Sequence, residues 1–474
     1  TAASQAVLER GGNAFDAVVA GGFVLPGPGG DPVRSPEVPS GRNLYAFEPD
    51  RLPTAAAYAA GEGALRQLVD AYRAEHGGQA PTKLAFSLWS SEAIRHLGVV
   101  ESQILHALGL RPEWDAAGRM RRLAIIRTEE LGRPRIDAVV QVTSIYRDQF
   151  DGFMRLLAEA VERLSTLDEP GNAVFANSAA VRARLVGLGV APERAASLAS
   201  ARIFGNAPGD YGSGLPGAVL DSTAYENDAP LAESFLERMG YAYGARGWGE
   251  RMEGGNLFAE QLRGVQAAVL SRSSNLNGVL STDHPFEYLG GLSMAVRHLD
   301  GSSPSLYVAD LRRPESRIAG AAAFLSDELR GRYLNPQWIR SMQEEGYAGT
   351  LAMTNLANNL CGWQVSDPAM VRPDQWQAVH DTLIRDSRNL GLDAWFERHN
   401  PTAQAQVIAR MAEAIRKGYW DADARTRQEL AERFAELAER HGAEAGAPAT
   451  RAFLAAASAG FGLEASAAPE TASQ

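Results

Sequence analysis

The segment STDHPFEYLGG holds the densest group of side chains in this chain that could bind a metal ion. His284 lies there beside Asp283 and Glu287, and imidazole with carboxylates suits a divalent ion such as Co²⁺. Pro285 follows the histidine, so the local backbone is not obviously helical and the three side chains need not converge. A structural or solvated histidine beside two acids is the alternative interpretation.

A second candidate pair is formed by Glu92 and His96. They are four residues apart in a helical pattern, so they share one face of that helix. The helix follows a buried strand, and open α/β sheets bind ligands at the carboxyl ends of their strands. We interpret the pair as groups for proton removal or metal capture. The alternative is an exposed i, i+4 pair, which stabilises a helix by about 0.3 kcal/mol.

Arg147 also follows a strand end, near residue 142, where its guanidinium could bind a substrate carboxylate with two hydrogen bonds. An ion pair with Asp148 at a helix start is the alternative. Two Gly-rich segments, PGPGGDP and APGDYGSG, could form nests of backbone N–H groups around a carboxylate, or they could simply be turns. Neither contains the Gly-Lys-Ser/Thr of a Walker loop.

These groups must be positioned by alternating strands and helices. We expect strands at 83–89, 122–126, 136–142 and 305–310, and helices at 92–108 and 148–164. The alternation predicts an α/β fold with an open, mostly parallel sheet flanked by helices, then a mixed region and a largely α-helical C-terminal region.

Composition shifts divide the chain further. The expected parts are an N-terminal helix and Pro/Gly-rich connector (1–53), an α/β domain (54–165), a helical and mixed region with Gly-rich loops (166–300), a mainly helical region (301–441) and an Ala/Gly/Ser-rich, partly disordered tail (442–474).

Composition also excludes several functions. The net charge of -11 argues against a nucleic-acid partner. The single cysteine, Cys361, rules out a disulfide framework and a Cys-rich zinc site, and fits the cytoplasm. The longest apolar runs fall short of the roughly 20 residues of a membrane span. The chain begins at Thr1 without a signal peptide, and we expect a fragment of a longer protein.

Four unusual segments occur in order along the chain: PGPGGDPVRSPEVPSGRNLYAF, ELGRPRIDAVVQV, RIFGNAPGDYGSG and LNPQWIRSMQEEGYAG. Together they resemble the C-terminal part of the large subunit of aerobic cobaltochelatase, CobN, a family that includes the H subunit of magnesium chelatase. The resemblance implies ATP-dependent insertion of Co²⁺ into hydrogenobyrinic acid a,c-diamide in cobalamin biosynthesis.

The resemblance also implies partners and roles. AAA+ ATPase and integrin-like subunits would assemble with this chain, and the ATPase, not this chain, would bind ATP and Mg²⁺. We predict that Glu92, His96 and His284 are catalytic, and the resemblance supports His284, because large chelatase subunits carry a similar acid-His-aromatic segment at this place. The predicted metal ligands are His284, Asp283 and Glu287, and the predicted substrate-binding residues are Arg147, Tyr211 and Arg42.

The sequence departs from the family in two places. The family's central H-G-T-H-G-x-x-E segment is absent, and a segment that often reads H-G-Y reads Glu345-Gly346-Tyr347. We therefore expect the chain to be inactive alone. The alternatives are a magnesium chelatase H-type subunit acting on protoporphyrin, and a non-catalytic scaffold that docks the AAA+ partners. Residues 1–25 also resemble the start of gamma-glutamyltranspeptidases, which would predict an amidohydrolase that cleaves itself before an internal threonine.

Overall fold

The computed structural model describes residues 48–221, 225, 227–313, 315–444 and 448–458, with the backbone of two short strands. These strands, β1 (Gly27–Gly29) and β2 (Asn43–Tyr45), pair in parallel. The chain divides into two compact units, Thr1–Leu52 and Pro53–Gln474. The first also contains the 3₁₀ turn η1 (Pro49–Arg51). The helix expected within 1–25 and the tail after 458 lie outside the described residues.

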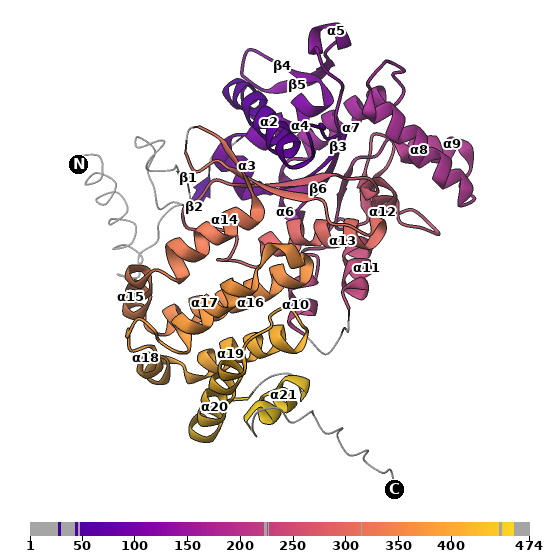
Figure 1. Ribbon diagram of the computed structural model, residues 1–474. Helices are drawn as coiled ribbons and strands as arrows, with labels where there is room; N and C mark the ends of the chain where they lie inside the picture. The colour runs from indigo at the N-terminus through magenta and orange to yellow at the C-terminus, as the bar shows by residue number, and fades with distance from the viewer. Residues whose placement is uncertain are drawn as a thin grey trace, which may run out of the picture. The chain divides into compact units, whose positions relative to one another are not determined.

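An eight-stranded sheet forms the centre of the second unit (Figure 1). Its order is β12-β11-β10-β3-β6-β7-β8-β9, and the five strands from β11 to β7 run parallel. The parallel strands are β3 (Lys83–Leu88), β6 (Asp137–Val142), β7 (Ile203–Gly205), β10 (Ala267–Arg272) and β11 (Ser305–Asp310). The antiparallel edge strands are β12 (Arg317–Gly320), β8 (Tyr241–Tyr243) and β9 (Trp248–Glu250). The predicted open, mostly parallel sheet is confirmed.

The chain builds this sheet in two directions from β3. It first adds β6 and β7 on one side, then returns to add β10 and β11 on the other. The strand order therefore reverses between β3 and β10. In open α/β sheets, such a reversal leaves a crevice at the carboxyl ends of the two strands, because the following connections diverge to opposite faces.

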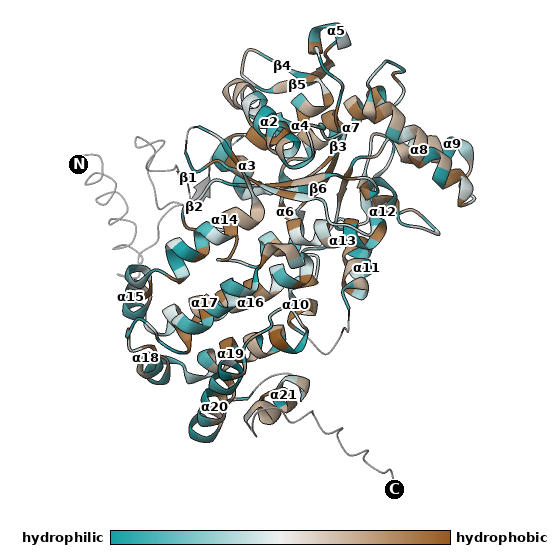
Figure 2. Cartoon of the chain, viewed as in Figure 1, coloured by the Kyte–Doolittle hydropathy of each residue, from teal (hydrophilic) through white to brown (hydrophobic). Residues whose placement is uncertain are grey.

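Helices cover both faces, so every residue of β3, β6 and β10 is buried. Figure 1 shows α2 and α4 on one side of the sheet and α12 and α13 on the other. The helices around the sheet are α2 (Ala55–Glu75), α3 (Ser90–His96), α4 (Val99–Leu108), α5 (Thr128–Leu131), α6 (Ser144–Gln149), α7 (Asp151–Ser165), α8 (Ala173–Gly187), α9 (Pro192–Ala199), α10 (Leu215–Leu220), α11 (Ala229–Arg238), α12 (Leu257–Leu262), α13 (Gly291–Asp300) and α14 (Ala321–Glu328). Figure 2 shows the central strands in brown and the outer helix α20 largely in teal, as burial of the sheet requires.

Two sequence predictions for this unit were wrong in detail. The single helix expected over 92–108 is broken into α3 and α4, because Leu97 (φ 56°) and Gly98 (φ 91°) adopt left-handed conformations. A side chain at Gly98 would lie 2.6 Å from Pro53 Cα, so the turn requires glycine. The strand expected at 122–126 exists as β5 (Met120–Ile125), but it pairs antiparallel with β4 (Leu110–Trp114) in a separate hairpin.

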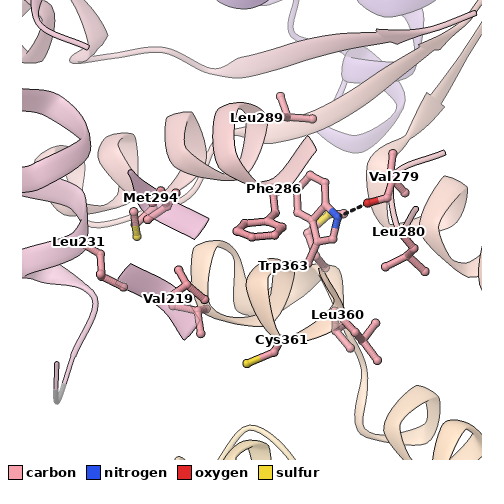
Figure 3. Close-up of a cluster of buried hydrophobic side chains, with 14 of the residues drawn as sticks. Val219, Leu231, Val279, Leu280, Phe286, Leu289, Met294, Leu360, Cys361 and Trp363 are labelled. Carbon is pink, nitrogen blue, oxygen red and sulfur yellow. Dashed lines mark hydrogen bonds between the residues drawn. The ribbon is translucent and has the colours of Figure 1, made fainter. Parts of the chain in front are cut away.

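The C-terminal region is helical, as predicted. It contains α15 (Pro336–Glu344), α16 (Tyr347–Ser366), α17 (Pro373–Leu383), α18 (Leu392–His399), α19 (Pro401–Arg416), α20 (Ala424–His441) and α21 (Pro448–Ser458), with π turns η2 (Phe286–Gly290) and η3 (Leu329–Tyr333) and the 3₁₀ turn η4 (Pro368–Met370). Figure 3 shows how α16 joins the rest of the unit. Trp363 is fully buried against Phe286, and its indole N–H donates to the carbonyl of Val279 at 2.9 Å.

Candidate functional site

The candidate site lies at the carboxyl ends of β3 and β10, and Trp89 is at its centre. Trp89 follows β3, and the guanidinium of Arg272, the last residue of β10, lies over its ring at 4.5 Å from the centroid. The rings of His284 and Tyr288 meet the same indole edge-on, with centroids at 5.8 and 5.7 Å. One aromatic side chain therefore brings together the start of α3, the end of β10 and the segment 284–288.

Glu92 is a buried member of this cluster, only 1% exposed. Its Oε1 accepts from Nη1 of Arg95 at 3.1 Å and lies 3.5 Å from Nη1 of Arg272. Its Oε2 is buried and has no hydrogen-bond partner in the described part of the chain. The alternative of an exposed Glu92–His96 pair is wrong because both residues are buried. The catalytic role assigned to Glu92 stays a prediction.

His96 holds the start of α4. Its Nδ1 accepts from the backbone N–H groups of Gly98 (3.2 Å) and Val99 (3.0 Å), so the proton of the neutral ring is on Nε2, 3.3 Å from Ser271 Oγ. Glu101 Oε2 lies 3.9 Å from Nδ1, but an unprotonated Nδ1 cannot form an ion pair with it. If Nδ1 accepted a proton as a base, it could no longer accept the hydrogen bonds from Gly98 and Val99. The predicted catalytic role of His96 remains untested.

Glu101 and Tyr146 were missed by sequence reasoning. The tyrosine hydroxyl donates to Oε1 of the glutamate at 3.0 Å, and both side chains are fully buried. Burial raises the pKa of Glu101 to about 7 and holds the pKa of Tyr146 well above its ordinary value. The signal was an acidic residue in the otherwise apolar stretch VVESQILHAL.

The three predicted metal ligands do come together. His284 Nδ1 lies 3.0 Å from Oε2 of Glu287 and 3.5 Å from Oδ1 of Asp283. The hydrogen bond to Glu287 raises the pKa of His284. Both carboxylates, however, face the same ring nitrogen, and the described residues contain no group of three His, Cys, Asp or Glu placed to hold a metal ion. His284 is 57% exposed, so its Nε2 is the nitrogen available for coordination. The three-ligand site stays a prediction.

The loop after β7, where a nest was predicted, binds a carboxylate of this chain. The backbone N–H and the hydroxyl of Ser213 donate to Oε1 of Glu287 at 2.7 and 2.8 Å. A side chain at Gly212 would approach the same oxygen to 3.6 Å. The loop therefore orients Glu287, which in turn orients His284.

Arg147 holds this loop in place. Its Nη1 donates to the carbonyls of Asn206, Ala207 and Asp210, and its Nε donates to Oδ1 of Asp148 at 2.7 Å. Tyr211 donates its hydroxyl to the other oxygen of Asp148 at 2.9 Å. The predicted Arg147–Asp148 ion pair is thus present. Substrate binding by Arg147 and Tyr211 stays a prediction, and Arg42 lies outside the described residues.

The fold defines an open α/β protein, and the candidate site lies at the reversal of its strand order. The chain belongs to the CobN/magnesium chelatase family, because the family model described as CobN/Magnesium Chelatase matches residues 12–427. This confirms the predicted resemblance. The amidohydrolase hypothesis rested on residues 1–25, which lie outside the described part of the chain, and it stays untested.

Named relatives include both branches of the family. The chain is 32% identical to the aerobic cobaltochelatase subunit CobN of a Sinorhizobium species, over 85% of this chain and 31% of that protein. It is also 32% identical to the H subunit of magnesium chelatase from Cereibacter sphaeroides, over 89% of this chain and 34% of that protein. A solved structure, the catalytic subunit of cobaltochelatase from Mycobacterium tuberculosis, matches with a TM-score of 0.82 at 29% identity, over 90% of this chain and 36% of that one.

The chain therefore spans about a third of the length of the relatives it matches. Its near-equal identity to both branches does not distinguish cobalt from magnesium. Among the described residues, no helix is long and apolar enough to cross a membrane.

Proposed function

We propose that this chain supplies part of the macrocycle cleft in the large subunit of an aerobic cobaltochelatase. In this proposal Co²⁺ is inserted into hydrogenobyrinic acid a,c-diamide, and AAA+ and integrin-like partners supply ATP hydrolysis with Mg²⁺. The observation that supports it is the cluster of His284, Glu92 and Arg272 around Trp89, at the sheet position where α/β proteins bind ligands.

The cluster offers what insertion demands. The ion must lose water ligands and the ring must lose its N–H protons, so a neutral imidazole and carboxylates are useful neighbours. Glu287 accepts at Nδ1 of His284, which leaves Nε2 to face an incoming ion. The unpartnered Oε2 of Glu92 is a buried acceptor in the same cluster of described residues.

The test is an absorbance and fluorescence titration of the purified chain with metal-free hydrogenobyrinic acid a,c-diamide and with protoporphyrin. We expect saturable binding of the corrinoid, weakened in His284→Ala and unchanged in His441→Ala, which removes an exposed histidine of α20. Preference for protoporphyrin would favour the magnesium branch. Binding of neither would favour the scaffold alternative.

We also propose that the isolated chain does not turn over. The family's H-G-T-H-G-x-x-E segment is absent from it, and no ATPase partner is present. Incubation with corrinoid, ATP and Co²⁺ should yield no cobalt corrinoid above the rate without protein. Catalytic turnover under these conditions would contradict the proposal.

A further inference from the structure

Arg272 presents one unoccupied edge of its guanidinium inside the protein. Its side chain is 2% exposed, and the only ion pair of this residue in the described chain joins Nη1 to Glu92 at 3.5 Å. Nε and Nη2 are buried, and neither has a hydrogen-bond partner in the described residues. The N–H bonds of these two nitrogens point the same way along one edge of the guanidinium plane, which is the fork that binds a carboxylate through two parallel hydrogen bonds.

The guanidinium is held in place without using that edge. One face stacks on Trp89. The indole is fixed in turn, because its N–H donates to Ser87 Oγ at 2.9 Å and that hydroxyl donates to Gln141 Oε1 at 2.6 Å. Glu92 fixes the Nη1 end. An arginine anchored on its face and at one end, with its fork unpaired, is preorganised for a ligand.

The two unpaired nitrogens of Arg272 cost free energy in the folded protein, and another unpaired polar atom lies nearby. Buried donors in folded proteins are nearly always paired, so two adjacent unpaired donors on one side chain require an explanation. The next residue, Ser273, also has a buried hydroxyl without a hydrogen-bond partner among the described residues. A pocket of about 240 Å³ is lined by Ser274 and Glu328, although Arg272 itself is not one of its lining residues.

The position of Arg272 in the sheet also indicates that it binds a ligand. It ends β10, and Trp89 and Glu92 follow β3, so the fork lies where the strand order reverses. Ligands of open α/β sheets bind at this point. The unpaired fork of Arg272 and its position in the sheet therefore both indicate that this residue binds a ligand.

We propose that the Nε and Nη2 edge of Arg272 binds a carboxylate of the macrocycle substrate and so positions the ring beside Trp89. This rests on the proposed function, since hydrogenobyrinic acid a,c-diamide carries free peripheral carboxylates. Arg272 is a substrate-positioning residue whose contact discriminates acidic macrocycles from neutral ones.

The experiment compares the metal-free corrinoid with the same corrinoid after methyl esterification of its carboxyl groups. Wild-type chain should bind the acid roughly 10- to 100-fold more tightly than the ester, because charge-assisted pairs are the strong ones. Arg272→Lys keeps a positive charge for Glu92 but loses the planar fork, and should lose most of that preference. Arg202→Lys is the matched control, since Arg202 is equally buried but is already paired with Asp137 at 2.9 Å.

A second variant guards against loss of folding. Glu92→Gln with Arg272→Gln removes both buried charges together, so neither is left unpaired, and circular dichroism checks the fold. An undiminished preference for the acid in both folded variants would overturn the proposal. A second outcome would also overturn the proposal. If inorganic phosphate stabilises wild type but not Arg272→Lys, and esterification of the corrinoid has no effect, the fork binds a small anion and not the macrocycle. If wild type binds neither macrocycle, the proposed function itself fails.

Discussion

Replacing Glu101 by glutamine should remove much of the pH dependence of stability. The carboxyl is fully buried, and burial raises its pKa from 4.5 to about 7. A raised carboxyl pKa means that the ionised form is disfavoured in the folded protein. Stability is therefore unaffected below the unfolded pKa near 4.5, falls as the pH rises from there to about 7, and stays reduced above that.

The magnitude follows from the two pKa values. The full penalty is about 3 kcal/mol, since each pKa unit corresponds to about 1.4 kcal/mol. Between pH 5 and pH 8 the wild type should lose about 2.5 kcal/mol through this group alone. Glutamine keeps a carbonyl for the Tyr146 hydroxyl, which donates to Oε1 at 3.0 Å, and cannot ionise.

Urea unfolding at pH 5 and pH 8, followed by tryptophan fluorescence, measures the effect. Glu101→Gln should gain stability relative to wild type at pH 8 and much less at pH 5. Glu129→Gln, at an exposed position of α5, is the control, and its effect on the free energy of unfolding should be the same at pH 5 and pH 8. An equal effect of Glu101→Gln at both pH values would refute a neutral Glu101 carboxyl in the folded protein.

Three further predictions concern other sites. The pKa of His284 is raised above its ordinary value of 6.5, so Co²⁺ binding should strengthen as the pH rises through this raised pKa. Visible absorption follows the binding, and an identical curve for His284→Ala would contradict the assignment. Gly362→Ala would place a methyl group 2.5 Å from the ring of Phe286 and should destabilise by about 1–3 kcal/mol in thermal unfolding. At Gly63 the nearest atom to such a methyl group would be 4.0 Å away, so Gly63→Ala should be neutral or stabilising. Burial raises the pKa of Cys361 to about 12, so iodoacetamide at pH 8 should label the unfolded but not the folded chain, and rapid labelling of folded protein would show that the thiol is accessible.

The sequence predicted three of the eight strands of the main sheet, because these three are continuous apolar runs, and it missed β7, β8, β9, β10 and β12. The strand expected at 305–310 is β11, and those at 83–89 and 136–142 differ from β3 and β6 by one residue. β7 was missed because three residues, Ile203–Gly205, are too short for a periodic pattern at the start of a Gly-rich loop.

The site was predictable only in part. His284, Asp283 and Glu287 are neighbours in sequence, so their clustering could be expected. Arg272 could not be found, because it ends an apolar strand and its partner Glu92 is 180 residues away. The break at Leu97 depends on close packing at Gly98, which no pattern in the helix reveals.

The contribution of the ion pair to folding stability does not explain why Glu92 and Arg272 are paired inside the protein. A buried ion pair gains little net free energy, because desolvation of both charges offsets their attraction. Here the pair also leaves Oε2 of the glutamate and two nitrogens of the arginine without partners in the described residues, which adds to the cost. A substrate that supplies a carboxylate to the arginine would remove the larger part of that cost on binding. The free energy recovered in this way would then favour the bound macrocycle over the empty site.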